Sequence, residues 1–200
     1  VVIVGGGPVG RTLSALLSRY GIEHCVVEAD AGYCTGSRAI CVSRRSQEIL
    51  AWAGAQAGVT NKGLPWTGGR SYWRDKEVLN FQMPHDTTQR FAPMVNIQQF
   101  YIEQFAHEAA KRQLGADPVM WGTRLQSLRE DADGVTAKVA LADGALREVR
   151  AQYLVACDGG RSTVRKRLGV KKCSFAPPEV MPEPARSAPV CSAAMTGGVR

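Results

Sequence analysis

The first ten residues carry a glycine pattern whose chemistry is phosphate binding. Gly5, Gly7 and Gly10, with Pro8 and Val9 between the last two, satisfy the spacing G-x-G-x-x-G. In this pattern the first glycine permits a tight turn, the second lets the backbone approach a diphosphate, and the third allows a helix to pack closely on a strand. The N–H groups and the dipole at the start of that helix attract the anion. The pattern therefore predicts a turn that holds the diphosphate of a dinucleotide.

A carboxylate follows at Glu28, just before Ala29. At the end of the second strand of such a unit, a carboxylate accepts hydrogen bonds from ribose hydroxyl groups and repels a 2′-phosphate. Glu28 therefore disfavours NADP at this first site and leaves FAD and NAD as candidates.

A second motif, D-G-x-x-S-x-x-R, begins at Asp158 and ends at Arg165. Asp158 would accept a hydrogen bond from a ribitol or ribose hydroxyl group, and Gly159 would allow the backbone to approach a ligand. Ser162 is expected to cap the next helix, and Arg165 to pair with phosphate or with Asp158. A strand-end turn followed by a capped basic helix is the alternative that needs no ligand.

Strands and helices of an α/β unit must position these residues. Residues 1–4 are a β-branched run typical of a buried parallel strand. Residues 8–20 have apolar side chains, Leu13, Leu16, Leu17 and Tyr20, at helical spacing, and residues 22–28 return as a second strand. The sequence thus predicts strand, glycine turn, helix and strand in its first thirty residues.

The remaining elements are predicted by periodicity and turn residues. Helices are expected from about Ser43 to Ala53 and over 96–114, with a Gly- and Ala-rich linker after the first. Asp133-Gly134 and Asp143-Gly144 are turn dipeptides, so three short strands near 119–130, 134–141 and 145–151 should form a β-meander. The other expectations are a loop at 31–45, a strand-like stretch at 70–83, a buried strand at 153–157 and a helix start at 162–168.

Composition limits the classes of function. An apolar share of 44% and a charged share of 22% over 200 residues describe a soluble globular chain, one domain or one domain plus part of another. No stretch approaches the roughly 18 apolar residues of a membrane span, so a cytoplasmic protein is expected. The net charge of +7 is concentrated after the second motif, without aromatic interleaving, which disfavours nucleic acid. The six cysteines lack metal-site spacing and are expected to be free, mostly buried thiols.

Taken together, the motifs resemble the N-terminal portion of the FAD-dependent aromatic hydroxylases. These are the para-hydroxybenzoate hydroxylase-like flavoprotein monooxygenases, and the likeness is greatest to the phenol and 3-(3-hydroxyphenyl)propionate hydroxylase branch. It covers about residues 1–172 and rests on the glycine turn, Glu28, Arg38-Ala39 with the helix after them, Gln99 with Glu103, and the Asp158 motif. It implies the glutathione-reductase-type FAD-binding fold, an α/β fold with a Rossmann-like βαβ unit and a crossover β-meander. Part of a substrate-binding region would lie at about 64–93, and a Pro-rich irregular tail at 173–200.

The resemblance also implies roles for individual residues. Arg38 would contact the FAD diphosphate, Gln99 the flavin or ribityl chain, and Arg124 the adenine side. Asp158 and Arg165 would belong to a motif that serves both FAD and NADPH. No catalytic side chain is identified, and His85 and His107 are expected to be surface or structural residues.

The implied reaction is hydroxylation of a small phenolic or aromatic substrate, typical of aromatic compound catabolism. NAD(P)H reduces FAD, oxygen adds at flavin C4a, and the hydroperoxide transfers one oxygen atom to the ring. Members of the family carry a downstream Gly-Asp-Ala-x-His motif that this sequence lacks, so the chain is expected to be an incomplete, N-terminal part. An FAD-linked dehydrogenase or oxidase, and a truncated non-catalytic nucleotide-binding chain, are the alternatives; the substrate and oligomeric state stay open.

Overall fold

The glycine turn belongs to a parallel sheet in the computed structural model, which describes residues 1–35 and 41–171. Strand β1 (Val2–Val4) lies between β2 (Cys25–Val27) and β12 (Leu154–Ala156), and β8 (Val119–Met120) lies beyond β2. All three pairings are parallel. The β-branched run is fully buried in β1, as predicted, whereas β12 at the edge of the sheet is half-buried or exposed.

Helix α1 (Pro8–Arg19) joins β1 to β2 and confirms the predicted helix, although its most buried residues are not the leucines. The predicted leucines at 13, 16 and 17 are only half-buried, and Tyr20 is exposed. The buried face consists instead of small residues and one arginine: Gly10, Arg11, Ser14, Ala15 and Ser18. Helix α4 (Gln99–Leu114) packs against α1 with its own alanines, 106, 109 and 110, fully buried. Short side chains on both helices allow this close packing.

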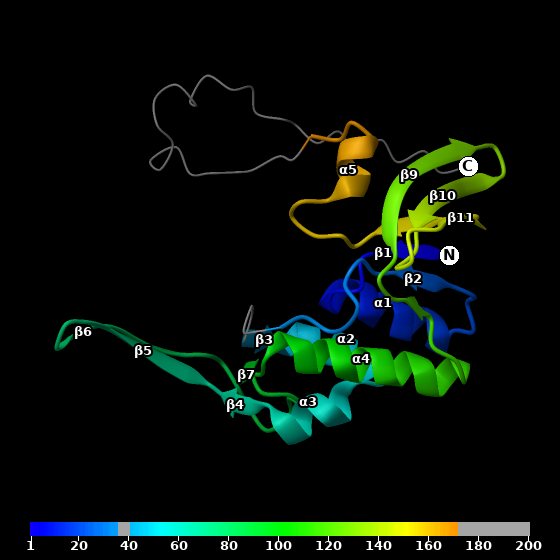
Figure 1. Cartoon of the computed structure of the whole chain (residues 1–200). Helices are drawn as coiled ribbons and strands as arrows, with labels where there is room; N and C mark the ends of the chain where they lie inside the picture. Colours follow the sequence, from blue (N-terminus) through cyan, green and yellow to red (C-terminus); the bar gives the residue numbers. More distant parts are fainter. Residues whose placement is uncertain (36–40, 172–200) are drawn as a thin grey trace, which may run out of the picture.

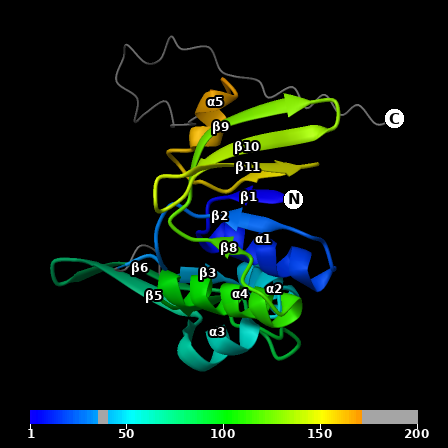
Figure 2. The same cartoon turned by 45° about the vertical axis from the view of Figure 1, so that its right-hand side comes forward.

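The predicted meander covers one face of the parallel sheet (Figures 1 and 2). Its strands are β9 (Arg124–Asp131), β10 (Gly134–Ala140) and β11 (Leu146–Ala151), paired antiparallel in the order β11-β10-β9. Residues Leu125, Ala137 and Val139 join Val2 and Val4 in one apolar cluster. The expected strand at 119–130 is divided, because 119–120 pair with β2 as β8 and only the later residues enter the meander.

The helices formed by residues 8–114 lie on the other face of the sheet (Figure 2). Helix α2 (Arg44–Trp52) begins after Ser43, whose hydroxyl oxygen accepts a hydrogen bond from the Ser46 N–H. The predicted linker after it is wrong in part, because Gln56–Lys62 forms helix α3. Ala55 and Val59 are buried in the same cluster as α4, and this packing explains a helix where Gly and Ala suggested none.

Residues 41–96 also build two small sheets. Strands β3 (Cys41–Ser43), β7 (Met94–Asn96) and β4 (Leu64–Trp66) form one of them, so the expected loop at 31–45 ends in a strand. Strands β5 (Gly68–Trp73) and β6 (Lys76–Gln82) form a hairpin that extends away from the sheet and helices (Figure 1). The last described helix, α5 (Thr163–Arg167), starts with the predicted Ser162 cap.

Several expectations about composition can be compared with the described residues. No described helix has the length and apolar character of a membrane span. No cluster of three or more His, Cys, Asp or Glu side chains suited to a metal ion occurs within 1–35 and 41–171. The expectation of mostly buried cysteines is wrong for these ranges, since Cys41 is exposed and Cys25, Cys34 and Cys157 are half-buried.

We expect Gly10→Ala to destabilise the fold and Gly7→Ala to leave it nearly unchanged. A Cβ atom at Gly10 would overlap the carbonyl oxygen of Gly5 and approach Cys157 Cβ to 3.3 Å, whereas one at Gly7 meets nothing within 4 Å. Overpacking of this kind costs about 2 kcal/mol. Urea unfolding of both variants measures the difference, and equal midpoints would contradict the proposed close packing.

Candidate functional site

A cavity opens where three parallel strands end. Gly5 follows β1, Glu28 follows β2, and Asp158 lies just beyond β12, at the same level of the sheet because Val4 pairs with both Val27 and Ala156. The cavity has a volume of about 580 Å³. Ligands of open α/β sheets bind at this edge, where chain connections leave in opposite directions.

The glycine turn forms one wall of the cavity. Gly5 has φ +101°, and a Cβ there would lie 2.5 Å from the Cys157 carbonyl oxygen and 2.8 Å from Asp158 Cα. A side chain at this position would therefore separate β1 from β12. Gly7 is the residue before α1, and no described side chain caps the helix there. Gly7 also lines the cavity, and no atom lies within 4 Å of the place where its Cβ would be. The start of the helix thus presents backbone N–H groups to a ligand.

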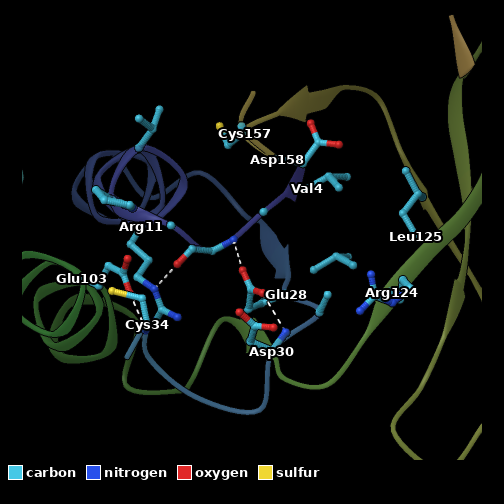
Figure 3. A pocket seen from close by; sticks show the side chains of 18 of the residues that line it. Val4, Arg11, Glu28, Asp30, Cys34, Glu103, Arg124, Leu125, Cys157 and Asp158 are labelled. Carbon is cyan, nitrogen blue, oxygen red and sulfur yellow. Dashed lines mark hydrogen bonds between the residues drawn. The ribbon is translucent and has the colours of Figure 1, made fainter. Parts of the chain in front are cut away.

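Glu28 connects the second strand to the turn (Figure 3). Its Oε2 accepts a hydrogen bond from Gly6 N–H at 2.5 Å, and its Oε1 accepts one from Asp30 N–H at 2.8 Å. Each carboxylate oxygen has a further lone pair that can accept a ligand hydroxyl group. Ala29 and Asp30 line the same part of the cavity. Asp30, which the motif did not predict, adds a second carboxylate unfavourable to a 2′-phosphate.

The two carboxylate oxygens of Asp158 have different surroundings. Oδ2 accepts hydrogen bonds from Thr163 N–H at 2.6 Å and Val164 N–H at 3.1 Å, and so caps α5. Oδ1 is buried and has no hydrogen-bond partner within the described ranges. A capped helix without a ligand, the alternative left by the sequence, accounts for Oδ2 and leaves Oδ1 unexplained. A buried acceptor of this kind fits a ligand hydroxyl group.

Most of the residues predicted to bind the cofactor meet at this cavity. Those that line it are Gly5, Gly7, Pro8, Val9, Glu28, Ala29, Gln99, Arg124, Asp158 and Gly159. Gly10 lies beneath the turn, in the predicted packing role. Arg165 does not line the cavity; it donates to the Gly160 carbonyl oxygen at 3.0 Å, and Arg161 takes a place in the wall instead. Arg38 lies outside the described residues.

The structure also decides between two neighbouring glutamines. Gln98 is the exposed residue that precedes α4, whereas Gln99 lines the cavity and donates from Nε2 to Glu103 Oε1 at 2.9 Å. Figure 3 shows Glu103 on one side of the glycine turn and Arg124, the first residue of β9, on the other. Elements distant in sequence therefore close the cavity from both sides.

Arg11 is a buried cavity residue that sequence reasoning missed. It is 1% exposed, its Nε donates to the Gly6 carbonyl oxygen, and its guanidinium lies 4.8 Å and 4.4 Å from the ring centroids of Tyr33 and Trp121. Its NH1 has no partner in the part of the chain that the structure describes. Burial lowers the pKa of Arg11, and the nearby charge of Glu103 acts in the opposite direction. An arginine among the inward-facing small residues of α1 was the available signal.

A partly buried hydrogen-bond chain supports the residues beside Arg11. Tyr33 Oη lies 2.8 Å from His107 Nδ1, and His107 Nε2 lies 2.7 Å from Asp117 Oδ1. Because a carboxylate only accepts, Nε2 donates to Asp117, and in a neutral imidazole Nδ1 then accepts from the tyrosine hydroxyl. His107 is thus a satisfied structural residue, which agrees with the sequence prediction.

Comparison with known proteins assigns the family. The profile of the family described as "FAD binding domain" matches residues 1–184. The chain belongs to the FAD-binding domain family. The α/β FAD-binding fold and the likeness to the aromatic hydroxylases, both predicted from sequence, are confirmed.

Curated relatives of the chain are monooxygenases and hydroxylases by name. It is 37% identical over 170 residues to rifampicin monooxygenase from Streptomyces venezuelae, covering 85% of the chain and 34% of the relative. It is 33% identical to a 3-(3-hydroxy-phenyl)propionate/3-hydroxycinnamic acid hydroxylase from Mycolicibacterium smegmatis, covering 85% of the chain and 30% of that protein. The chain therefore spans about a third of the length of these relatives.

Solved structures show the same fold. The flavin-dependent monooxygenase PieE, in complex with FAD and substrate, aligns with a TM-score of 0.74 at 28% identity, over 84% of this chain and 31% of that one. Aklavinone-11 hydroxylase with FAD and aklavinone aligns with a TM-score of 0.71 at 27% identity, over 84% and 34%.

The residues present fit the dinucleotide part of FAD. The uncapped start of α1 and the open face of Gly7 suit a diphosphate. Glu28 suits hydroxyl groups, and so does Oδ1 of Asp158, which has no hydrogen-bond partner among the described residues. The donor and acceptor set therefore agrees with the family assignment.

Replacing Arg11 with alanine should destabilise the protein by about 3 kcal/mol, because it removes a buried side chain that donates to the Gly6 carbonyl oxygen and packs against the rings of Tyr33 and Trp121. Arg45→Ala is the matched control: Arg45 also lies over a tryptophan ring, Trp52, but its side chain is 64% exposed, so the loss should stay below about 1 kcal/mol. Denaturant unfolding of the two variants gives the comparison. Similar small losses would show that Arg11 does not hold the turn.

Proposed function

We propose that the chain binds FAD in this cavity and forms the nucleotide-binding part of an NAD(P)H-dependent monooxygenase that hydroxylates a small aromatic ring. The observation that carries the proposal is the convergence of an uncapped helix start, Glu28 and the unpartnered Asp158 Oδ1 at the ends of three parallel strands. The names of the relatives favour oxygen insertion over an FAD-linked dehydrogenase or oxidase.

The chain's own residues bind and orient the cofactor in this proposal. The backbone at Gly7 and the start of α1 hold the diphosphate, Glu28 accepts from the adenosine ribose, and Gln99 lies toward the flavin end. Bound FAD, reduced by a nicotinamide nucleotide, would supply the chemistry that activates oxygen. We assign Arg38 to the diphosphate and Arg124 to the adenine side by resemblance. Arg165, which lies outside the cavity wall, we keep only as a candidate contact for NAD(P)H.

We also propose that residues 64–93 contribute to the substrate-binding region. The β5–β6 hairpin in this range exposes apolar side chains, among them Trp73, Val78 and Leu79. Exposed apolar side chains on an extended hairpin fit a surface that meets other apolar groups, such as an aromatic substrate or further protein.

Titration with FAD tests the binding site. Gly7→Ala should weaken FAD binding by about tenfold or more, since it pushes the diphosphate from the backbone and one charge-assisted hydrogen bond contributes ~1.5–3 kcal/mol. Gly160→Ala adds the same methyl group in open space outside the cavity wall and should have no effect. Binding is measured by the change in flavin fluorescence. ADP should compete with FAD and FMN should not, because the glycine turn and Glu28 face the adenylate half. Unchanged affinity in Gly7→Ala would argue against this site.

Isotopically labelled dioxygen tests the reaction. With FAD, NAD(P)H and a panel of phenols, we expect labelled oxygen in a hydroxylated product detected by mass spectrometry. Substrate turnover with no incorporated label would instead indicate a dehydrogenase or oxidase, and FAD binding without turnover would indicate a chain that only binds the nucleotide.

A further inference from the structure

We propose that Glu103 is a positioning residue for the cofactor cavity, which fixes the side-chain amide of Gln99 so that its carbonyl oxygen is left to accept a hydrogen bond from the ligand. The inference rests on the proposed function, because it concerns the same cavity. It adds a residue that does not come from the glycine turn or from the second motif.

Glu103 is placed between the cavity wall and the helix layer. It is 2% exposed and lies one turn after Gln99 on α4. Its Oε1 accepts from Gln99 Nε2 at 2.9 Å, and its Oε2 accepts from the backbone N–H of Cys34 at 3.0 Å. Figure 3 shows Glu103 and Cys34 side by side next to Arg11. The bond to the backbone at Cys34 holds the carboxylate in one orientation.

The chemistry of a carboxylate sets the direction of the Gln99 amide. A carboxylate has acceptors only, so the NH₂ group of Gln99 must face Glu103. The carbonyl oxygen of Gln99 is then the atom left for a hydroxyl or N–H donor in the cavity. A glutamine at position 103 could not reproduce this arrangement, because one amide oxygen cannot serve both Gln99 and Cys34 in the same geometry, and its NH₂ group would favour the reversed amide.

The positive charge of Arg11 stabilises the buried carboxylate of Glu103. Its guanidinium lies in the same wall, and the opposite charges of Arg11 and Glu103 act on each other across the buried space. The Nε of Arg11 is bonded to the Gly6 carbonyl oxygen, so the cation is fixed to the glycine turn. Glu103 therefore connects two parts of the cavity: Gln99 through a hydrogen bond and the glycine turn through the charge of Arg11.

The same helix offers a matched control. Gln104 Nε2 donates to Glu108 Oε1 at 2.8 Å, with the same residue types and the same spacing of four as Gln99 and Glu103. Neither Gln104 nor Glu108 lines the cavity. Glu108→Gln thus removes an equal charge from α4, at a Gln–Glu pair of the same spacing that does not line the cavity.

The experiment is a double-mutant cycle on the full chain, read as the dissociation constant for FAD. We expect Glu103→Gln to weaken FAD binding about fivefold, the effect of one ordinary hydrogen bond, and Glu108→Gln to leave it within twofold. In a Gln99→Ala background, Glu103→Gln should change the affinity by less than twofold, because the group that Glu103 positions is already gone. Thermal melting of each variant establishes that it is folded.

The sign of the effect separates positioning from simple electrostatics. Removing a negative charge near a diphosphate site should strengthen the binding of an anion if charge alone matters, so tighter binding in Glu103→Gln would overturn the proposal. An equal loss in both backgrounds would overturn it as well, because a purely structural role is additive. Glu103→Asp retains the charge but is too short to reach both partners; it should weaken FAD binding only when Gln99 is present, and it serves if Glu103→Gln does not fold.

Failure of this inference is distinct from failure of the proposed function. If the unmodified chain binds FAD and Glu103→Gln binds it equally well, Glu103 has no positioning role and the FAD site stands. If the unmodified chain fails to bind FAD, the proposed function fails and this inference fails with it.

Discussion

The absence of side chains at Gly5 and Gly10 is the constraint on which the rest of the structure depends. The backbone of Cys157 and Asp158, just after β12, lies where a side chain at Gly5 would be, and the Gly5 carbonyl oxygen lies where one at Gly10 would be. Because no side chains separate them, β1, the start of α1 and the residues just after β12 come into close contact at the glycine turn. The carboxyl ends of β1, β2 and β12 then lie together, and the cavity lies at these strand ends.

Electrostatics then determines what the turn can hold. The start of α1 favours an anion, and Arg11 adds a full positive charge beneath the same turn, linked to it through the Gly6 carbonyl oxygen. A buried guanidinium is costly unless other groups stabilise it. Glu103 provides an opposite charge, and the rings of Tyr33 and Trp121 provide polarisable faces. The tyrosine and histidine chain to Asp117 orders one of those rings. The polar groups in this wall therefore support one another.

The sequence predicted the parts of the fold that follow from backbone chemistry. The glycine turn, the Asp-Gly turns of the meander and the Ser162 cap are local and could be read directly. The packing of the helices could not be predicted from the sequence in this way. The spacing of the leucines predicted helix α1, but it did not show that the most buried face would consist of small residues packed against the alanines of α4. Helix α3 was missed because its stability comes from burial of Val59 and not from helix propensity.

Prediction from the sequence had similar limits at the candidate functional site. Motifs marked the residues at strand ends, and the structure gathered those that it describes, apart from Arg165, around the turn. Arg11 belongs to no motif, and its importance depends on Glu103 and Trp121, which lie about ninety and a hundred and ten positions away. The choice between Gln98 and Gln99 depended on where α4 begins. Contacts between distant segments carry this information, and a single sequence does not display them.

The cavity has different chemistry at its two ends, and this restricts how an elongated ligand can bind. Glu28 and Asp30 provide carboxylates on the β2 side, which suit hydroxyl groups, and the start of α1 suits the diphosphate. Gln99 lies on the α4 side and, held by Glu103, offers a single acceptor. In the proposed binding mode the backbone at Gly7 sets the position of the diphosphate, and the side chains on its two sides differ: carboxylates on one side, and on the other an amide whose NH₂ group is already bonded to Glu103. The two ends of the cavity therefore offer different hydrogen-bond partners to an elongated ligand.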